Sequence, residues 1–296
     1  MKVTANWTPL EPDLETVFAA EDDPLDALAE GRISGIVLRG VFNPGHCTGL
    51  IQRFVERRLM RGFPGTTSKD TGQFVGDTRT RIDIGSSLVN LTRSRDAIAE
   101  GNDLSKENFL QHATGTHELF AHLFDGFDNP VDTLYSALSA LAPGKVVKVA
   151  REPDGRLYGP AIFRIHYAGH AYSPHINHVG IGDRLLNFAV SRFTHQFAGL
   201  ICFQNSAHEG RSPHAVVHRC FWSPEVEAHI ANGTFYEYAA QNEIEQHSIE
   251  VEPGDFYLFN SGCIHEVAAV EGTTPRIVLA TFIGYSADDE EIFVWS

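Results

Sequence analysis

Residues 167–178 read Tyr-Ala-Gly-His-Ala-Tyr-Ser-Pro-His-Ile-Asn-His, and this stretch carries the strongest signal for fold and chemistry. If it forms a β-strand, successive side chains point to opposite faces. His175 and Asn177 would then share one face and could contact one ion, whereas His178 would point the other way. The stretch therefore predicts half of a metal site on a strand.

A second stretch complements the first. Residues 254–260 read Gly-Asp-Phe-Tyr-Leu-Phe-Asn, a turn followed by an apolar strand, and lead to His265 and then to Arg276. A neutral imidazole is the commonest protein metal ligand, and two imidazoles with one oxygen donor leave open positions on octahedral iron. If His175 and His265 meet across a sheet, the result is a non-heme iron site suited to O2 chemistry.

These motifs, taken in order, resemble the Fe(II)/2-oxoglutarate-dependent oxygenase superfamily. Its pattern runs Tyr-x-Gly, His-x-Asp, a distal His and an Arg about one strand later. The matching residues are Tyr167, Gly169, His175, His265 and Arg276. The departure is Asn177, which stands where the superfamily carries its carboxylate.

Within that superfamily the chain is most similar to the carrier-independent halogenases of indole-alkaloid pathways and their hydroxylase relatives. The similarity lies in Val216-Val217-His218 leading to Trp222-Ser223-Pro224, in the spacing of the distal His and Arg, and in the closing Val294-Trp295-Ser296. It covers the second half of the chain well and the first half loosely.

The resemblance implies a set of roles. Fe(II) would be bound by His175 and His265, with Asn177 as a weak or absent third ligand. 2-Oxoglutarate would chelate the iron, with its distal carboxylate on Arg276 and a hydrogen bond from Tyr167. Reaction with O2 would release succinate and CO2 and oxidise an unactivated C–H bond of a free small molecule of secondary metabolism.

Asn177 leaves the outcome of that oxidation open. Halogenases of the superfamily carry Gly or Ala at this position, which frees a site for chloride; Asn is equally neutral, but its carbonyl oxygen could coordinate the metal. We expect hydroxylation, desaturation or ring closure first, and halogenation as the alternative. A non-catalytic jelly-roll that binds a small molecule is a second alternative. His178-Val179-Gly180 also reproduces a His-x-Gly motif and offers a competing register on the opposite strand face.

Composition limits the possible partners. The 296 residues are 43% hydrophobic and 21% charged, as in ordinary globular proteins, with a formal charge of −15. That charge argues against nucleic acid and anionic membranes and favours a small-molecule partner. Residues 1–20 lack a signal-peptide core, and no apolar run approaches the ~18 residues of a membrane span. We therefore expect a soluble, cytoplasmic protein.

The order of predicted elements gives the fold class. Helices are expected at 24–29, 44–61, 106–124 and 131–141, a strand at 33–42, and a long loop at 62–87 in which Arg79 or Arg81 could meet an anionic substrate. From residue 146 short apolar runs alternate with turn residues. We predict an α+β, mainly β fold: a helical and strand scaffold, 1–145, packed on a double-stranded β-helix (jelly-roll), 146–296, in one compact unit.

Overall fold

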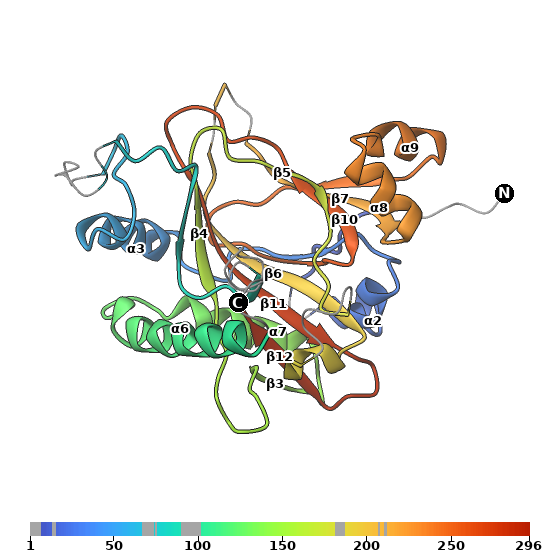
Figure 1. Ribbon diagram of the computed structural model, residues 1–296, viewed down its shortest axis with the longest axis horizontal. Helices are drawn as coiled ribbons and strands as arrows, with labels where there is room; N and C mark the ends of the chain where they lie inside the picture. Colours follow the sequence, from blue (N-terminus) through green and yellow to red (C-terminus); the bar gives the residue numbers. More distant parts are fainter. Residues whose placement is uncertain are drawn as a thin grey trace.

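The computed structural model describes residues 7–13, 16–66, 74, 76–89, 102–180, 187–206, 208–209 and 212–296. Within these residues two β-sheets face each other across the centre of the molecule, and helices lie outside them (Figure 1). The α+β, mainly β jelly-roll expected from the sequence is thereby confirmed.

The larger sheet has eight strands among the described residues, in the order β1-β9-β6-β11-β12-β3, with β4 pairing β11 and β2 pairing β4. All its pairs are antiparallel except β12 with β3. The strands are β1 (Ile36–Leu38), β2 (Arg81–Ile84), β3 (Val146–Val149), β4 (Ile162–His166), β6 (His195–Gln204), β9 (Phe256–Asn260), β11 (Arg276–Tyr285) and β12 (Glu291–Trp295).

The smaller sheet has the order β5-β10-β7-β8 and is antiparallel throughout. Its strands are β5 (Tyr172–His175), β7 (Ala215–Phe221), β8 (Gln246–Ile249) and β10 (Cys263–Val267). It supplies the two histidine stretches, whereas the larger sheet supplies the arginine. The jelly-roll thus places residues 175, 265 and 276 around one interior.

The helices are α1 (Val17–Ala20), α2 (Pro24–Ala29), α3 (Pro44–Glu56), α6 (Asn102–Leu123), α7 (Pro130–Leu141), η2 (Ala189–Arg192), α8 (Pro224–Ala231) and α9 (Phe235–Gln241). Asp23, Asn43 and Asn129 cap α2, α3 and α7 through their side chains, and each cap precedes a proline in the first helical turn, as the sequence indicated.

Three expected boundaries differ from the structure. Helix α3 stops at Glu56 instead of continuing to residue 61, because Arg58 adopts a positive φ of 58° that breaks the helical repeat. The strand expected at 33–42 is shorter in the structure, because β1 covers the three residues that pair with β9. The expected loop at 62–87 contains β2, and its residues 67–73 and 75 lie outside the described residues.

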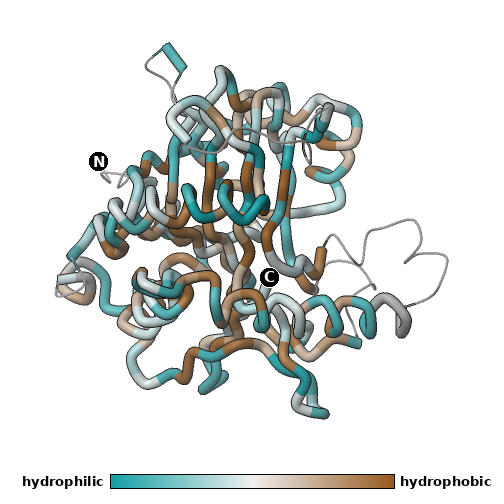
Figure 2. Tube along the Cα trace, turned by 90° about the vertical axis from the view of Figure 1, so that its left-hand side faces the viewer, coloured by the Kyte–Doolittle hydropathy of each residue, from teal (hydrophilic) through white to brown (hydrophobic). Residues whose placement is uncertain are grey.

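The principal hydrophobic core joins the two halves of the chain. Phe163 on β4 packs edge-on against Phe54 of α3 at 4.7 Å and against Phe203 of β6 at 5.0 Å between ring centroids. Leu138 of α7 is fully buried in the same cluster. Figure 2 shows apolar segments concentrated on the interior strands and hydrophilic segments on outer helices and loops. Among the described residues no helix is long and apolar enough to cross a membrane.

Candidate metal and co-substrate site

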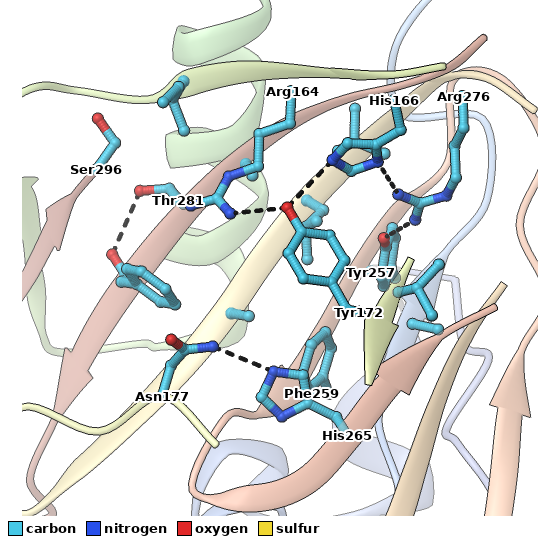
Figure 3. Close-up of a pocket in the computed structure, with 18 of the residues that line it drawn as sticks. Arg164, His166, Tyr172, Asn177, Tyr257, Phe259, His265, Arg276, Thr281 and Ser296 are labelled. Atoms are coloured by element: carbon cyan, nitrogen blue, oxygen red, sulfur yellow. Dashed lines mark hydrogen bonds between the residues drawn. The ribbon is translucent and has the colours of Figure 1, made fainter. Parts of the chain in front are cut away.

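A cavity lies between the two sheets. Strands β4, β5, β6, β9, β10 and β11 line it, and its apolar wall includes Leu200, Phe259 and Val278. Its polar side chains include Arg164, His166 and Arg276, which lie above Asn177 and His265 in the view of Figure 3. His175, Asn177, His265 and Arg276 all line the cavity, so the fold brings together four of the five residues selected from the sequence.

His175 and His265 are directly opposite each other in the β5–β10 pair, and their ring centroids are 4.2 Å apart. The Nδ1 atom of His175 lies 2.8 Å from the carbonyl oxygen of Ser173, and the Nδ1 atom of His265 lies 2.9 Å from that of Cys263. A carbonyl oxygen only accepts, so Nδ1 carries the proton in both rings. Each ring is therefore the Nδ1–H tautomer, whose Nε2 carries the lone pair that can bind a metal.

The electrostatics of His265 agree with this tautomer. The ring is buried, and burial together with the neighbouring His175 lowers its pKa to about 3. A group with that pKa is neutral at physiological pH. The imidazole is therefore ready to coordinate without first losing a proton.

Asn177 completes the end of the cavity next to the histidines. Its Nδ2 atom lies 3.3 Å from Nε2 of His265, and the two side chains point toward one another in Figure 3. Ser261 fixes the Asn177 backbone: its carbonyl accepts from the Asn177 amide at 2.9 Å, and its hydroxyl donates to the Asn177 carbonyl at 2.8 Å. The Asn177 amide therefore lies beside His265 at this end of the cavity.

This donor set suits a divalent metal that takes its remaining ligands from solution. Two imidazole rings lie next to each other beside a neutral amide. No group of three His, Cys, Asp or Glu side chains within holding distance of one ion occurs in the described part of the chain. Imidazole nitrogen suits iron, and two protein ligands leave positions for a chelating co-substrate and another small ligand.

The competing register around His178 faces away from the cavity. The His178 Nδ1 atom accepts a hydrogen bond from the Gly180 amide at 2.9 Å, and Nε2 donates to the Thr194 carbonyl at 3.2 Å. Both ring nitrogens are therefore used by backbone groups. Of the two registers, the one through His175 points into the cavity.

Arg276 is the buried cation of the cavity, with only 3% of its surface exposed. Its Nη2 donates to the Tyr257 hydroxyl at 2.9 Å, and its Nη1 lies 3.4 Å from Nδ1 of His166. No ion pair found among the described residues includes it. A buried guanidinium without a carboxylate partner is a site for a ligand carboxylate.

Tyr167 is the selected residue that the structure places outside the cavity. Strand alternation turns His166 inward and Tyr167 outward, where its hydroxyl accepts from the Arg61 amide at 2.9 Å and the Arg61 guanidinium lies 3.8 Å above its ring. Gly169 of the same motif has φ of 85°, which glycine adopts freely, so this part of the motif shapes a turn.

Arg79 and Arg81, suggested as substrate contacts, do not line the cavity. Arg79 pairs with Asp77 on the surface, and Arg81 pairs with Asp83 on β2. The buried Cys263 is also no cavity residue, and burial raises the pKa of its thiol to about 12.

Several polar cavity residues were missed from the sequence, among them Arg164, His166 and Tyr172. The signal for the first two was present, because they alternate with Phe163 and Ile165 in an inward–outward pattern on β4. His166 is buried, and burial together with the charge of Arg276 holds its pKa well below its usual value.

The sequence matches the family model described as carrier-protein-independent halogenase WelO5 over residues 8–296. The protein belongs to this family. The resemblance to the carrier-independent group of Fe(II)/2-oxoglutarate-dependent oxygenases is thereby confirmed. A comparison with curated protein sequences found no significant match.

Solved structures share the fold of this family member. An N-substituted L-amino acid dioxygenase from Burkholderia ambifaria AMMD is similar with a TM-score of 0.59 and 15% identity, over 95% of this chain and 91% of that one. The same dioxygenase in complex with alpha-KG is similar with a TM-score of 0.55 and 14% identity, over 92% and 90%. At these identities the likeness establishes the fold.

Proposed function

We propose that the protein oxidises an unactivated C–H bond of a free small molecule, using Fe(II), 2-oxoglutarate and O2. The Nε2 atoms of His175 and His265 hold the iron, and Arg276 binds the distal carboxylate of 2-oxoglutarate. When bound, iron and 2-oxoglutarate supply the oxidant, with release of succinate and CO2. The chain itself positions the substrate against the metal and excludes water with the apolar wall of the cavity.

The observation that carries the proposal is the pair of imidazoles with ring centroids 4.2 Å apart, each with its Nδ1 bound to a backbone carbonyl and its Nε2 therefore unprotonated. Two rings in the same tautomer at this distance suit coordination of one metal ion. Metal-binding histidines commonly donate their second ring N–H to a backbone carbonyl, as both rings do here. The family match and the unpaired Arg276 support the same reading.

Halogenation is the outcome that the site supports best. A His pair without a carboxylate leaves the metal one negative charge short, and chloride restores that charge in the position beside Asn177. Once a metal takes the lone pair of His265, the Asn177 amide loses its acceptor and its N–H groups become available to a halide. The description of the family as halogenases that need no carrier protein favours a free substrate.

Hydroxylation is the second candidate, because the Asn177 side chain could itself coordinate the metal in place of chloride. A half-turn of the amide would direct its carbonyl oxygen toward a metal bound at His265. The backbone bonds to Ser261 fix the position of Asn177 beside His265. A hydroxyl product would then be expected in place of a chlorinated one.

The decisive experiment compares products with and without chloride. The Fe(II)-loaded enzyme is supplied with 2-oxoglutarate, O2 and a panel of N-substituted amino acids, chosen because the dioxygenase of similar fold is named for them. Mass analysis then distinguishes chlorinated from hydroxylated product. A chlorinated product that disappears in chloride-free buffer supports halogenation, and a hydroxylated product at all chloride concentrations supports the second candidate.

A separate measurement distinguishes an oxygenase from a non-catalytic binding protein. Anaerobic addition of Fe(II) and 2-oxoglutarate to a competent site gives a visible charge-transfer absorption band. If the folded protein shows no band and binds no metal, the oxidative proposal fails and a binding jelly-roll remains.

A further inference from the structure

Arg164 is a second guanidinium in the cavity, and no acidic partner for it is found among the described residues. It projects from β4 into the cavity, and its Nε is buried without a hydrogen bond. Its Nη1 donates to the Tyr172 hydroxyl at 3.3 Å, and no hydrogen bond from Nη2 is found within the described part of the chain. Nε and Nη2 form the side edge of the guanidinium, which can donate two parallel hydrogen bonds to a carboxylate. This edge has no such partner among the described residues.

Tyr172 adds a donor next to this edge. The Arg276 guanidinium can only donate, so the His166 Nδ1 that it meets accepts, and the proton of His166 sits on Nε2. That Nε2 lies 3.2 Å from the Tyr172 hydroxyl, which thus accepts from both His166 and Arg164. The hydroxyl hydrogen has no acceptor among the described residues and is free to donate into the cavity.

The described residues supply no compensating negative charge to the cavity, because none of those that line it is Asp or Glu. The carboxylate opposite Arg164 in the β2–β4 register is Asp83, which accepts two hydrogen bonds from Arg81 at 2.7 and 2.5 Å and does not line the cavity. A partly buried cation without a counter-charge is unfavourable, so this geometry indicates an anionic ligand.

2-Oxoglutarate alone does not satisfy both arginines. In the proposed function one of its carboxylates chelates the metal and the other binds Arg276. Arg164 lies on the other side of His166 from Arg276 in Figure 3, toward Thr281 and Ser296. 2-Oxoglutarate therefore leaves the charge of Arg164 unbalanced, and a second anionic molecule is needed to balance it.

We propose that the substrate carries a carboxylate, which Arg164 binds through its Nε–Nη2 edge and Tyr172 binds through its hydroxyl. This inference rests on the proposed function, since it assigns the substrate of that same cavity. It defines the substrate class as free organic acids and fixes one end of the molecule. The C–H bond to be oxidised then lies between this end and the two histidines.

The test uses the full chain loaded with Ni(II), which supports binding without turnover, and with 2-oxoglutarate. The probes are N-acyl amino acids in matched pairs, each acid beside its primary amide, and affinity is measured by calorimetry. We expect acids to bind and amides to bind at least about tenfold more weakly. Arg164→Gln should remove this preference, Tyr172→Phe should weaken acid binding by about three- to tenfold, and Arg156→Gln on the surface should change neither.

Three results would overturn the inference: amides that bind as tightly as their acids, no acid that binds, or an Arg164→Gln variant that keeps the preference for acids. A fourth result would also overturn it: an Arg164→Gln variant with weaker affinity for 2-oxoglutarate would show that Arg164 binds the co-substrate and not the substrate. Arg164→Lys keeps the charge and controls for folding, as does circular dichroism of each variant.

The outcomes separate this inference from the proposed function. If wild-type protein binds metal and 2-oxoglutarate but prefers neutral ligands, only the inference fails. If it binds neither metal nor 2-oxoglutarate while acids still bind through Arg164 in metal-free protein, the oxidative function fails and the carboxylate site stands.

Discussion

His175 and His265 face each other across strands β5 and β10, and each donates its Nδ1–H to the carbonyl oxygen two residues earlier in its own chain segment. This repeated local arrangement fixes both tautomers before any metal arrives. In the proposed metal site both rings are therefore already oriented, and metal binding would require release of the Asn177 contact with His265.

Replacing either histidine should abolish metal binding. His175→Ala or His265→Ala leaves one imidazole, and we expect the affinity for Fe(II) or Co(II) to fall by more than about 100-fold, beyond what loss of an orienting partner alone produces. Calorimetric titration under anaerobic conditions measures this change. His178→Ala is the matched control, because His178 lies outside the cavity; an equal loss in this variant would transfer the metal site to the other register.

Changing Asn177 should redirect the chemistry. Asn177→Asp supplies the missing carboxylate, so we expect about tenfold tighter metal binding and hydroxylated product without dependence on chloride. Asn177→Gly opens space and should raise the ratio of chlorinated to hydroxylated product. Mass analysis of products over a chloride series gives this ratio, and identical ratios in all three proteins would show that residue 177 does not face the metal.

Arg276 should control co-substrate affinity. Arg276→Gln removes the cation but keeps a polar side chain, and loss of a buried charge pair costs about 2–5 kcal/mol, so the Kd for 2-oxoglutarate should rise about 30-fold or more. The absorption band formed with Fe(II) reports the titration. Arg79→Gln, on the surface, should leave the Kd unchanged; an unaltered Kd in Arg276→Gln would place the distal carboxylate elsewhere.

His170 should make the fold sensitive to mild acid. Burial, followed by the charge of Arg81, lowers its pKa to about 4, against about 6.5 in the unfolded chain. Between these two values the unfolded state binds more protons, so the free energy of unfolding falls as pH drops from 6.5 to 4 and is fully restored above 6.5.

A His170→Gln variant should lose part of that slope. The full shift corresponds to about 3 kcal/mol, and partial exposure of the ring reduces the expected contribution to about 1 kcal/mol. Urea denaturation at a series of pH values measures it. His166 titrates in the same direction and remains in the variant, so a residual slope is expected; an unchanged slope would show that His170 is not involved.

The shared core predicts that the chain unfolds as one unit. Phe163→Ala removes a ring that touches both Phe54 of the first half and Phe203 of the second, and should destabilise the protein by about 3–5 kcal/mol. We expect one calorimetric transition in wild type and variant, shifted to lower temperature. Two transitions, with only one displaced, would show that residues 1–145 and 146–296 fold separately.

Much of the architecture was readable from local chemistry. The starts of α2 and α3 at Pro24 and Pro44 were predicted from the sequence, and the alternation of short apolar runs with turn residues after residue 146 indicated the jelly-roll. These signals are local, since capping and strand periodicity depend on a few neighbouring residues. The pairing of His175 with His265 was inferred from the order of motifs and not from either residue alone.

The sequence by itself determined the fold class, the histidine pair and the missing carboxylate, because strand alternation and motif order are properties of the chain. The tertiary structure decided which other side chains share the cavity with those residues. It turned His178 and Tyr167 away from the cavity and brought Arg164 and His166 into it. It also left two guanidinium groups there with no acidic partner among the described residues. Counter-charges and unused hydrogen bonds depend on which segments meet in space, and no local pattern encodes that.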